Sequence, residues 1–145
     1  MSFINRVLSS RPAIAPLLLR IPVGIIFIGH GSQKLFGWFG GYGLEGTAHW
    51  MASIGLTPGI VMATLSGSAE FFGGLCIFLG LLTRPAAAVV CFTMLVAIFS
   101  VHISHGLFLA HHGFEYALAL AAVCASLVAS GSGHCGIDKI LSKRV

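Results

Sequence analysis

Long apolar stretches, separated by short polar segments, dominate the chain. We predict a helix over four of them, at residues 17–36, 60–82, 85–104 and 114–129. A helix of about twenty apolar residues crosses the roughly 30 Å hydrocarbon core of a bilayer. The pattern therefore predicts an all-α integral membrane protein, a four-helix bundle that forms a single membrane domain over residues 1–145.

The ends of the predicted helices carry local signals. Thr57 and Thr83 stand just before proline-containing first turns, and we expect each hydroxyl to cap a helix. Gly131 and Gly133 follow the fourth stretch and are expected to end it. Residues 45–54, between the first two stretches, predict a short helix that lies in the membrane interface.

The charge pattern gives an orientation. Only 8% of the residues are charged and 57% are hydrophobic, whereas soluble domains carry roughly a quarter charged residues. Lysine and arginine concentrate before the first stretch, at Arg84, and after the fourth stretch, so both termini are predicted to be cytoplasmic. No basic patch is interleaved with aromatic residues, which argues against nucleic acid and in favour of lipid headgroups as partners. Arg20 is expected to reach the cytoplasmic interface.

Glu70 is a single charge in the middle of the second apolar stretch. A carboxylate at that depth must be neutral, paired with a cation, or part of a polar cavity. Small residues surround it on one helix face, and such stripes allow membrane helices to approach closely. We therefore expect Glu70 to point into the bundle. The stripe consists of Ala63, Ser66, Gly67, Gly73 and Gly74.

Other polar residues fall at a similar depth on the predicted helices. Because helical side chains lean toward their own N-terminus, His30 and Glu70 are expected to converge. An alternative is that the polar groups only hold the helices together, with a salt bridge between Lys34 and Glu115. The predicted cavity opens toward the outer leaflet and is lined by His30, Gln33, Lys34, Glu70, His102 and Glu115.

Histidines and cysteines raise the question of metals and disulfides. His102 and His105 are one turn apart, and imidazole is a common metal ligand, but no acidic or thiolate partner stands at a fixed spacing. We therefore expect no metal site, with these two residues as the place for one if it exists. The cysteines are expected to be small apolar fillers, and the sequence leaves open whether any of them pair. They are Cys76, Cys91, Cys124 and Cys135.

Taken in order, the motifs of the chain resemble the DoxX family of small four-span bacterial membrane proteins. Ser132 departs from the pattern, because the family often has proline there, and this affects only a helix end. The resemblance implies a multi-pass protein of the inner membrane. The matching residues are Leu19-Arg20 with Gly24, Gly31-x-x-Lys34-Leu35, Glu70-x-x-Gly73-Gly74, Gly80-Leu81-x-Thr83-Arg84-x-Ala86-Ala87, His102, Glu115, and Gly131-x-Gly133 followed by Asp138.

The DoxX family takes its name from a subunit of an archaeal thiosulfate:quinone oxidoreductase, and some members are associated with oxidative or thiol stress. The resemblance and the polar residues together predict a redox component that works with a quinone. Glu70, His30 and Lys34 would then be catalytic, and the cofactor would contact three further residues: Gln33, His102 and Glu115.

Two other functions stay open at this point. The chain has no motif typical of a flavin, a haem or an iron–sulfur cluster, so electrons would come from a partner subunit or from the substrate. A non-catalytic partner or assembly subunit of a redox or stress-response complex, or a homo-oligomer, fits the same residues. A transporter of a small solute or of protons is the third possibility, although four spans without a repeat are few for one.

Overall fold

The computed structural model describes residues 13–142, and within this range the chain is helical. The predicted all-α class is confirmed. Four long helices follow the four apolar stretches: α2 (Ala15–Phe36), α4 (Gly59–Leu79), α5 (Thr83–Ala97) and α6 (Glu115–Ser130). Four of the basic residues from which the orientation was predicted lie outside the described residues, namely Arg6, Arg11, Lys143 and Arg144.

Shorter helices connect or follow the long ones. A helix does form where the interfacial one was predicted, α3 (Gly43–Ser53), and α7 (Ile137–Ser142) comes after α6. The remaining turns are η1 (Trp38–Gly40), the π-helical η2 (Ile98–His102), η3 (Ile103–His105) and η4 (Leu109–His111).

Three helical segments are long and apolar enough to cross a membrane. They are α2, α4 and the continuous segment Thr83–His105, in which α5 runs on through η2 and η3. Helix α6 is apolar but has only 16 residues, so it is about 24 Å long at 1.5 Å per residue. By length and composition, three helical segments can thus cross a membrane, and the fourth span stays a prediction.

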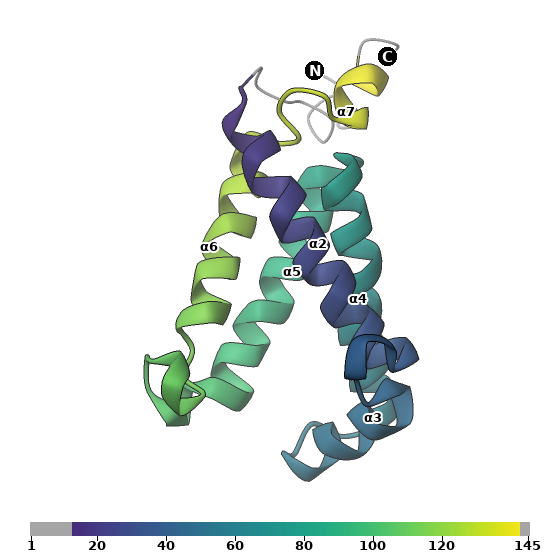
Figure 1. The fold of residues 1–145 in the computed structure, drawn as a ribbon, viewed down its shortest axis with the longest axis vertical. Helices are drawn as coiled ribbons and strands as arrows, with labels where there is room; N and C mark the ends of the chain where they lie inside the picture. Colours follow the sequence, from purple (N-terminus) through teal and green to yellow (C-terminus); the bar gives the residue numbers. More distant parts are fainter. Residues whose placement is uncertain (1–12, 143–145) are drawn as a thin grey trace.

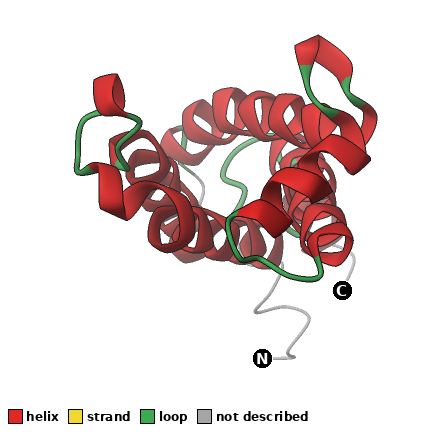
Figure 2. Ribbon diagram, turned by 90° about the horizontal axis from the view of Figure 1, so that it is seen from below, coloured by secondary structure: helices red, strands yellow, loops and turns green. Residues whose placement is uncertain are grey.

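The long helices converge at one end of the molecule and diverge at the other (Figure 1). Helix α2 packs along α4 and α5 packs along α6, while α4–α5 and α2–α6 contacts join the two pairs. The convergent end, where α7 lies, is called the α7 end here, and the divergent end the α3 end. At the α3 end, α3 and the α5–α6 loop lie on opposite sides of the molecule (Figures 1 and 2).

Glycines of α2 lie against bulky residues of α4, and glycines of α4 lie against bulky residues of α2, so the two helices are in close contact. A Cβ atom added to Gly24 of α2 would lie 2.8 Å from the Cβ of Phe78, and one added to Gly74 of α4 would lie 2.8 Å from the Cβ of Phe27. Each helix thus leaves space for bulky residues of the other, as small residues do in membrane helix pairs. The same relation joins Gly31 with Phe71 and Gly67 with Leu35.

Arg20 is buried at the α7 end, so the prediction that it reaches the membrane interface is wrong. Its side chain is 2% exposed, and it donates hydrogen bonds to carbonyl oxygens of α4 and of the segment after α6. Those segments cover the guanidinium and satisfy its donors in place of water. The acceptors are the carbonyl oxygens of Phe78, Ser132 (3.1 Å), His134 (3.4 Å) and Cys135 (3.0 Å).

Asp138 caps α5 from the far end of the chain. It is 1% exposed, and its two carboxylate oxygens accept hydrogen bonds from the backbone N–H groups of Leu82 (2.6 Å) and Thr83 (2.9 Å). The predicted hydroxyl caps are wrong, since neither Thr57 nor Thr83 makes a capping hydrogen bond. A carboxylate satisfies the first N–H groups of a helix and also suits its positive dipole end. The predicted end of α6 is confirmed, with Gly131 as its C-cap.

All four cysteines are free thiols. Cys124 is completely buried in the core between the long helices, and Cys135 is exposed at the α7 end. Cys76 and Cys91 are partly buried and do not pair.

The glycine contacts predict that Gly31→Leu destabilises the protein. A Cβ atom at Gly31 would collide with the backbone of Phe71, and overpacking of this kind costs about 1–3 kcal/mol. Thermal unfolding in detergent, followed by circular dichroism, measures the effect. Gly29→Ala is the matched control, because a Cβ at Gly29 has nothing within 4 Å. Equal midpoints for Gly31→Leu and the wild type would show that the α2–α4 contact is looser than described.

The Asp138 cap predicts a loss of about 1 kcal/mol of stability in Asp138→Ala, as for other helix caps. Lys139→Ala, one residue further, should leave the midpoint unchanged. Chemical denaturation in mixed micelles compares the two variants. A cap that contributes nothing would give indistinguishable curves.

Candidate functional site

Glu70 and Lys34 form an ion pair between α4 and α2. Glu70 is 2% exposed, which confirms that it points into the bundle, and its Oε1 lies 2.5 Å from the Nζ of Lys34. The two helices approach closely beside this pair, since a Cβ atom added to Gly67 would lie 3.3 Å from the Cβ of Lys34. The second carboxylate oxygen, Oε2, is buried and has no hydrogen-bond partner among the described residues. One acceptor of the buried carboxylate is therefore left for a proton, a water molecule or a ligand.

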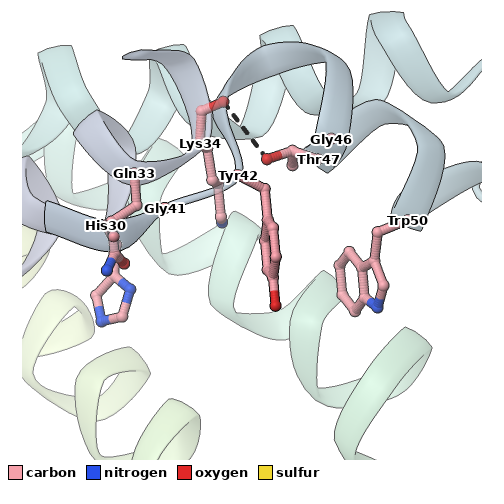
Figure 3. Close-up of a pocket in the computed structure, with 9 residues that line it drawn as sticks. His30, Gln33, Lys34, Gly41, Tyr42, Gly46, Thr47 and Trp50 are labelled. Atoms are coloured by element: carbon pink, nitrogen blue, oxygen red, sulfur yellow. Dashed lines mark hydrogen bonds between the residues drawn. The ribbon is translucent and has the colours of Figure 1, made fainter. Parts of the chain in front are cut away.

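A cavity of about 470 Å³ lies directly beside this pair at the α3 end, and Lys34 is part of its wall. Side chains of α2 and α3 and of the segment between them project into the same space (Figure 3). The residues that line the cavity are His30, Gln33, Lys34, Gly40, Gly41, Tyr42, Gly46, Thr47 and Trp50.

The segment between α2 and α3 folds back onto α2 and shapes the cavity. Gly37 ends α2 in the left-handed conformation, with φ of 72°, which a glycine adopts without strain. Gly41 then contacts the backbone of Gln33 so closely that a side chain at this position would collide with it. The Nε2 of Gln33 donates to the carbonyl oxygen of Phe39 at 3.3 Å and holds the fold-back. This geometry places Tyr42 at the cavity.

Three cavity residues were not singled out from the sequence: Tyr42, Thr47 and Trp50. Thr47 of α3 is held close to α2, with its Oγ1 donating to the carbonyl oxygen of Lys34 at 3.4 Å (Figure 3). The cluster of glycines at residues 40–43 was the available signal, because it marks a tight bend that returns the chain to α2.

Glu70, His102 and Glu115 are not among the residues that line this cavity, so the prediction of one cavity lined by all six polar residues is wrong. The Nδ1 of His102 lies 2.7 Å from the carbonyl oxygen of His112, and Glu115 accepts a hydrogen bond from the backbone N–H of Leu109 at 2.5 Å. Both side chains order the α5–α6 loop. The helix pairs diverge at the α3 end and carry that loop away from Lys34, which also excludes the salt bridge with Glu115 in this conformation.

The remaining loop histidines are close to one another. The Nδ1 of His105 lies 3.0 Å from the carbonyl oxygen of Val101, and the ring centroids of His105 and His112 are 6.5 Å apart. Across residues 13–142, no group of three or more His, Cys, Asp or Glu side chains is placed to hold a metal ion.

His30 reaches the cavity without contacting Glu70. The side chain from α2 that meets Glu70 is therefore not His30, as expected, but Lys34, one turn further along the helix. Lys34 both lines the cavity and pairs with the carboxylate. The cavity wall therefore presents an imidazole, an amide and an ammonium group as hydrogen-bond donors. Behind the ammonium lies a buried carboxylate with one free oxygen. This set can bind a flat polar ligand and exchange a proton with it.

The chain was compared with protein families and with individual proteins, and both comparisons find matches. The model of the DoxX family matches residues 15–103. A Bacillus subtilis (strain 168) protein named "Putative oxidoreductase CatD" is 34% identical over 130 residues, covering 90% of this chain and 89% of the relative.

Two further relatives carry less specific names. An uncharacterized protein of Haemophilus influenzae is 30% identical over 133 residues, covering 87% of this chain and 90% of the relative. The Escherichia coli (strain K12) protein named "Inner membrane protein YphA" is 33% identical over 84 residues, covering 58% of this chain and 55% of that protein. No solved structure matches the chain.

The ion pair predicts a non-additive response to substitution. Lys34→Met leaves Glu70 buried without a counter-charge, which for a buried pair costs about 3–5 kcal/mol. In Lys34→Met/Glu70→Leu no buried charge is left, and we expect most of the lost stability to return. Thermal unfolding of the single and double variants in one detergent provides the measurement. A single variant as stable as the wild type would mean that the two groups do not interact.

Proposed function

The chain belongs to the DoxX family, and we propose that it is a quinone-linked redox component whose polar cavity holds the quinone headgroup. The family match covers residues 15–103, in agreement with the resemblance drawn from the sequence. The protein is a multi-pass protein of the inner membrane, in line with its three membrane-spanning helices and the name of its Escherichia coli relative. The name of the Bacillus subtilis relative supports a redox role.

The proposal places four helices across the membrane. Helix α6 is the fourth span, both termini are cytoplasmic, and α3 lies in the outer interface. The start of α2 and the whole of α7 lie at the same end of the molecule, as an even number of crossings requires (Figure 1). The α3 end is then the outer end, and the cavity opens near the outer surface of the membrane, where quinone headgroups can reach it.

The observation that carries the proposal is the position of Lys34 between the cavity and Glu70. A volume of about 470 Å³ falls within the usual range of small-molecule sites. Tyr42 and Trp50 supply flat aromatic surface for a planar ring, and His30, Gln33 and Lys34 supply donors for carbonyl oxygens. A structural ion pair alone would need neither a cavity beside it nor a free carboxylate oxygen.

The reaction that this arrangement favours is the two-electron, two-proton interconversion of a quinone and its quinol. In the reducing direction, electrons increase the negative charge on the carbonyl oxygens, and the Lys34 ammonium stabilises that charge and donates one proton. A proton taken up at Glu70 then returns to Lys34 and restores the ion pair. His30, one turn earlier on α2, donates the second proton from its protonated imidazolium form and regains it from water at the outer surface. The two electrons come from a partner subunit or from a reduced substrate.

The proposal predicts that duroquinone, a quinone without a tail, binds the purified protein and quenches Trp50. Trp38→Phe should keep the quenching and Trp50→Phe should lose most of it, because Trp50 lines the cavity and Trp38 does not. Lys34→Met/Glu70→Leu should weaken binding about tenfold or more, the value of one charge-assisted hydrogen bond.

Two results would contradict this proposal. Failure of duroquinone to bind the wild type would remove the quinone site. Equal affinity in the double variant would make the ion pair structural and favour the non-catalytic partner subunit instead.

A further inference from the structure

We propose that the natural ligand is a quinone with a long hydrocarbon tail, and that a second cavity, between α2 and α6, holds the first part of this tail. The inference rests on the proposed function and deepens it, because it distinguishes a quinone dissolved in the membrane from one dissolved in water.

The second cavity adjoins the headgroup cavity. It has a volume of about 240 Å³, and two of its residues, His30 and Gln33, also line the first cavity. His30 and Gln33 therefore border both spaces, and the inference places a single ligand across these two residues. The residues that line the second cavity are Ile26, Gly29, His30, Gln33, Phe39 and Tyr116.

The second cavity extends deeper along α2 than the first. Lys34 lies two residues from the end of α2 and Ile26 lies ten residues from it. At 1.5 Å per residue these positions are about 3 Å and about 15 Å from the α3 end of the helix. Along α2 the lining thus changes from the ammonium of Lys34 near the end of the helix to the apolar Ile26 deeper in it, while Phe39, past the end of α2, also lines the second cavity. This gradient matches a polar headgroup with an apolar tail that points into the bilayer.

Gly29 provides the space for the tail. A Cβ atom added to Gly29 would have nothing within 4 Å, whereas one added to Gly31, on the opposite side of the helix, would collide with α4. Gly31 is explained by helix packing, and Gly29 is not. A glycine inside a helix costs roughly 0.5–1 kcal/mol relative to alanine. Gly29 leaves a groove on the side of α6. A ligand that occupies this groove would explain why the helix has a glycine here in spite of its cost in stability.

His30 lies where the headgroup and the tail would meet. Its side chain is exposed although α2 spans the membrane, and a polar group in that position requires a partner. The ring of Tyr116, from α6, has its centroid 6.4 Å from the imidazole centroid and is tilted by 56°. A quinone carbonyl placed between the two cavities would accept a hydrogen bond from His30, and the tail would pass between Gly29 and Tyr116.

The acyl chain of a phospholipid has the same hydrocarbon chemistry as a quinone tail. We assign the second cavity to the quinone tail because it shares His30 and Gln33 with a site whose donors suit carbonyl oxygens. A bound phospholipid is the competing occupant in the test below.

The test compares a quinone with a tail and one without. Gly29→Leu fills the second cavity and leaves every residue that lines only the first one unchanged. We expect this variant to lose about tenfold or more in affinity for decylubiquinone, since several methylene groups lose their burial, while its affinity for duroquinone stays within about twofold. Affinities are taken from Trp50 quenching and expressed relative to the wild type for each ligand, so that partition into detergent cancels.

Two further variants complete the design. Ile25→Phe adds similar bulk on an exposed face of α2 outside both cavities and should change neither affinity. Tyr116→Trp narrows the second cavity from the side of α6 and should reproduce the selective loss. It keeps the inference testable if Gly29→Leu fails to fold.

The outcomes separate the inference from the proposed function. Equal loss of both ligands, or loss of neither, would overturn the tail site while duroquinone binding to the wild type still supported the headgroup site. A phospholipid that co-purifies with the wild type and is lost in Gly29→Leu, with decylubiquinone binding unchanged, would also overturn it. If the wild type does not bind duroquinone, the proposed function itself fails, and the tail site fails with it.

Discussion

The contact between the Lys34 ammonium and the buried Glu70 carboxylate is the interaction on which the proposed site depends. A carboxylate inside a membrane protein is tolerated when a cation or hydrogen-bond donors accompany it. Here the partner is supplied by α2, which reaches α4 because glycines at positions such as Gly31 and Gly74 remove the side chains that would separate the helices. The ion pair therefore depends on the close packing that the small residues of α2 and α4 allow. The helix packing positions the ion pair, and Lys34 of that pair lines the cavity.

The two ends of the molecule differ in how their polar groups are used. At the α7 end, Arg20 and Asp138 are buried, and the described hydrogen bonds direct them to the backbone of neighbouring segments. These bonds join α2, α4 and α5 to the segment that contains α7. At the α3 end the helix pairs diverge (Figure 1), and Lys34, Gln33 and His30 line the cavity. The α7 end is thus closed by hydrogen bonds between segments, and the cavity of the proposed site lies at the α3 end.

Local patterns in the sequence predicted the helices well, because apolar length and small-residue stripes are properties of single segments. They also showed that Glu70 faces inward. They did not show which cation pairs with it, since Lys34 is 36 positions away and helix rotation decides between several partners. The buried roles of Arg20 and Asp138 depend on contacts between residues 112 and 56 positions apart. The contact of Glu115 with the α5–α6 loop, in place of Lys34, followed from the divergence of the helices, which no local pattern reports.

Solid-state NMR on protein in lipid bilayers, with ¹⁵N at lysine Nζ and ¹³C at glutamate Cδ, tests the central claim most directly. The chain has three lysines and three glutamates, and Lys34–Glu70 is the pair in contact among the described residues. The account predicts one strong nitrogen–carbon dipolar coupling, absent in Glu70→Gln, and a shift of the Lys34 nitrogen signal when duroquinone is added. The absence of the coupling, or a Lys34 signal that does not respond to the quinone, would contradict it.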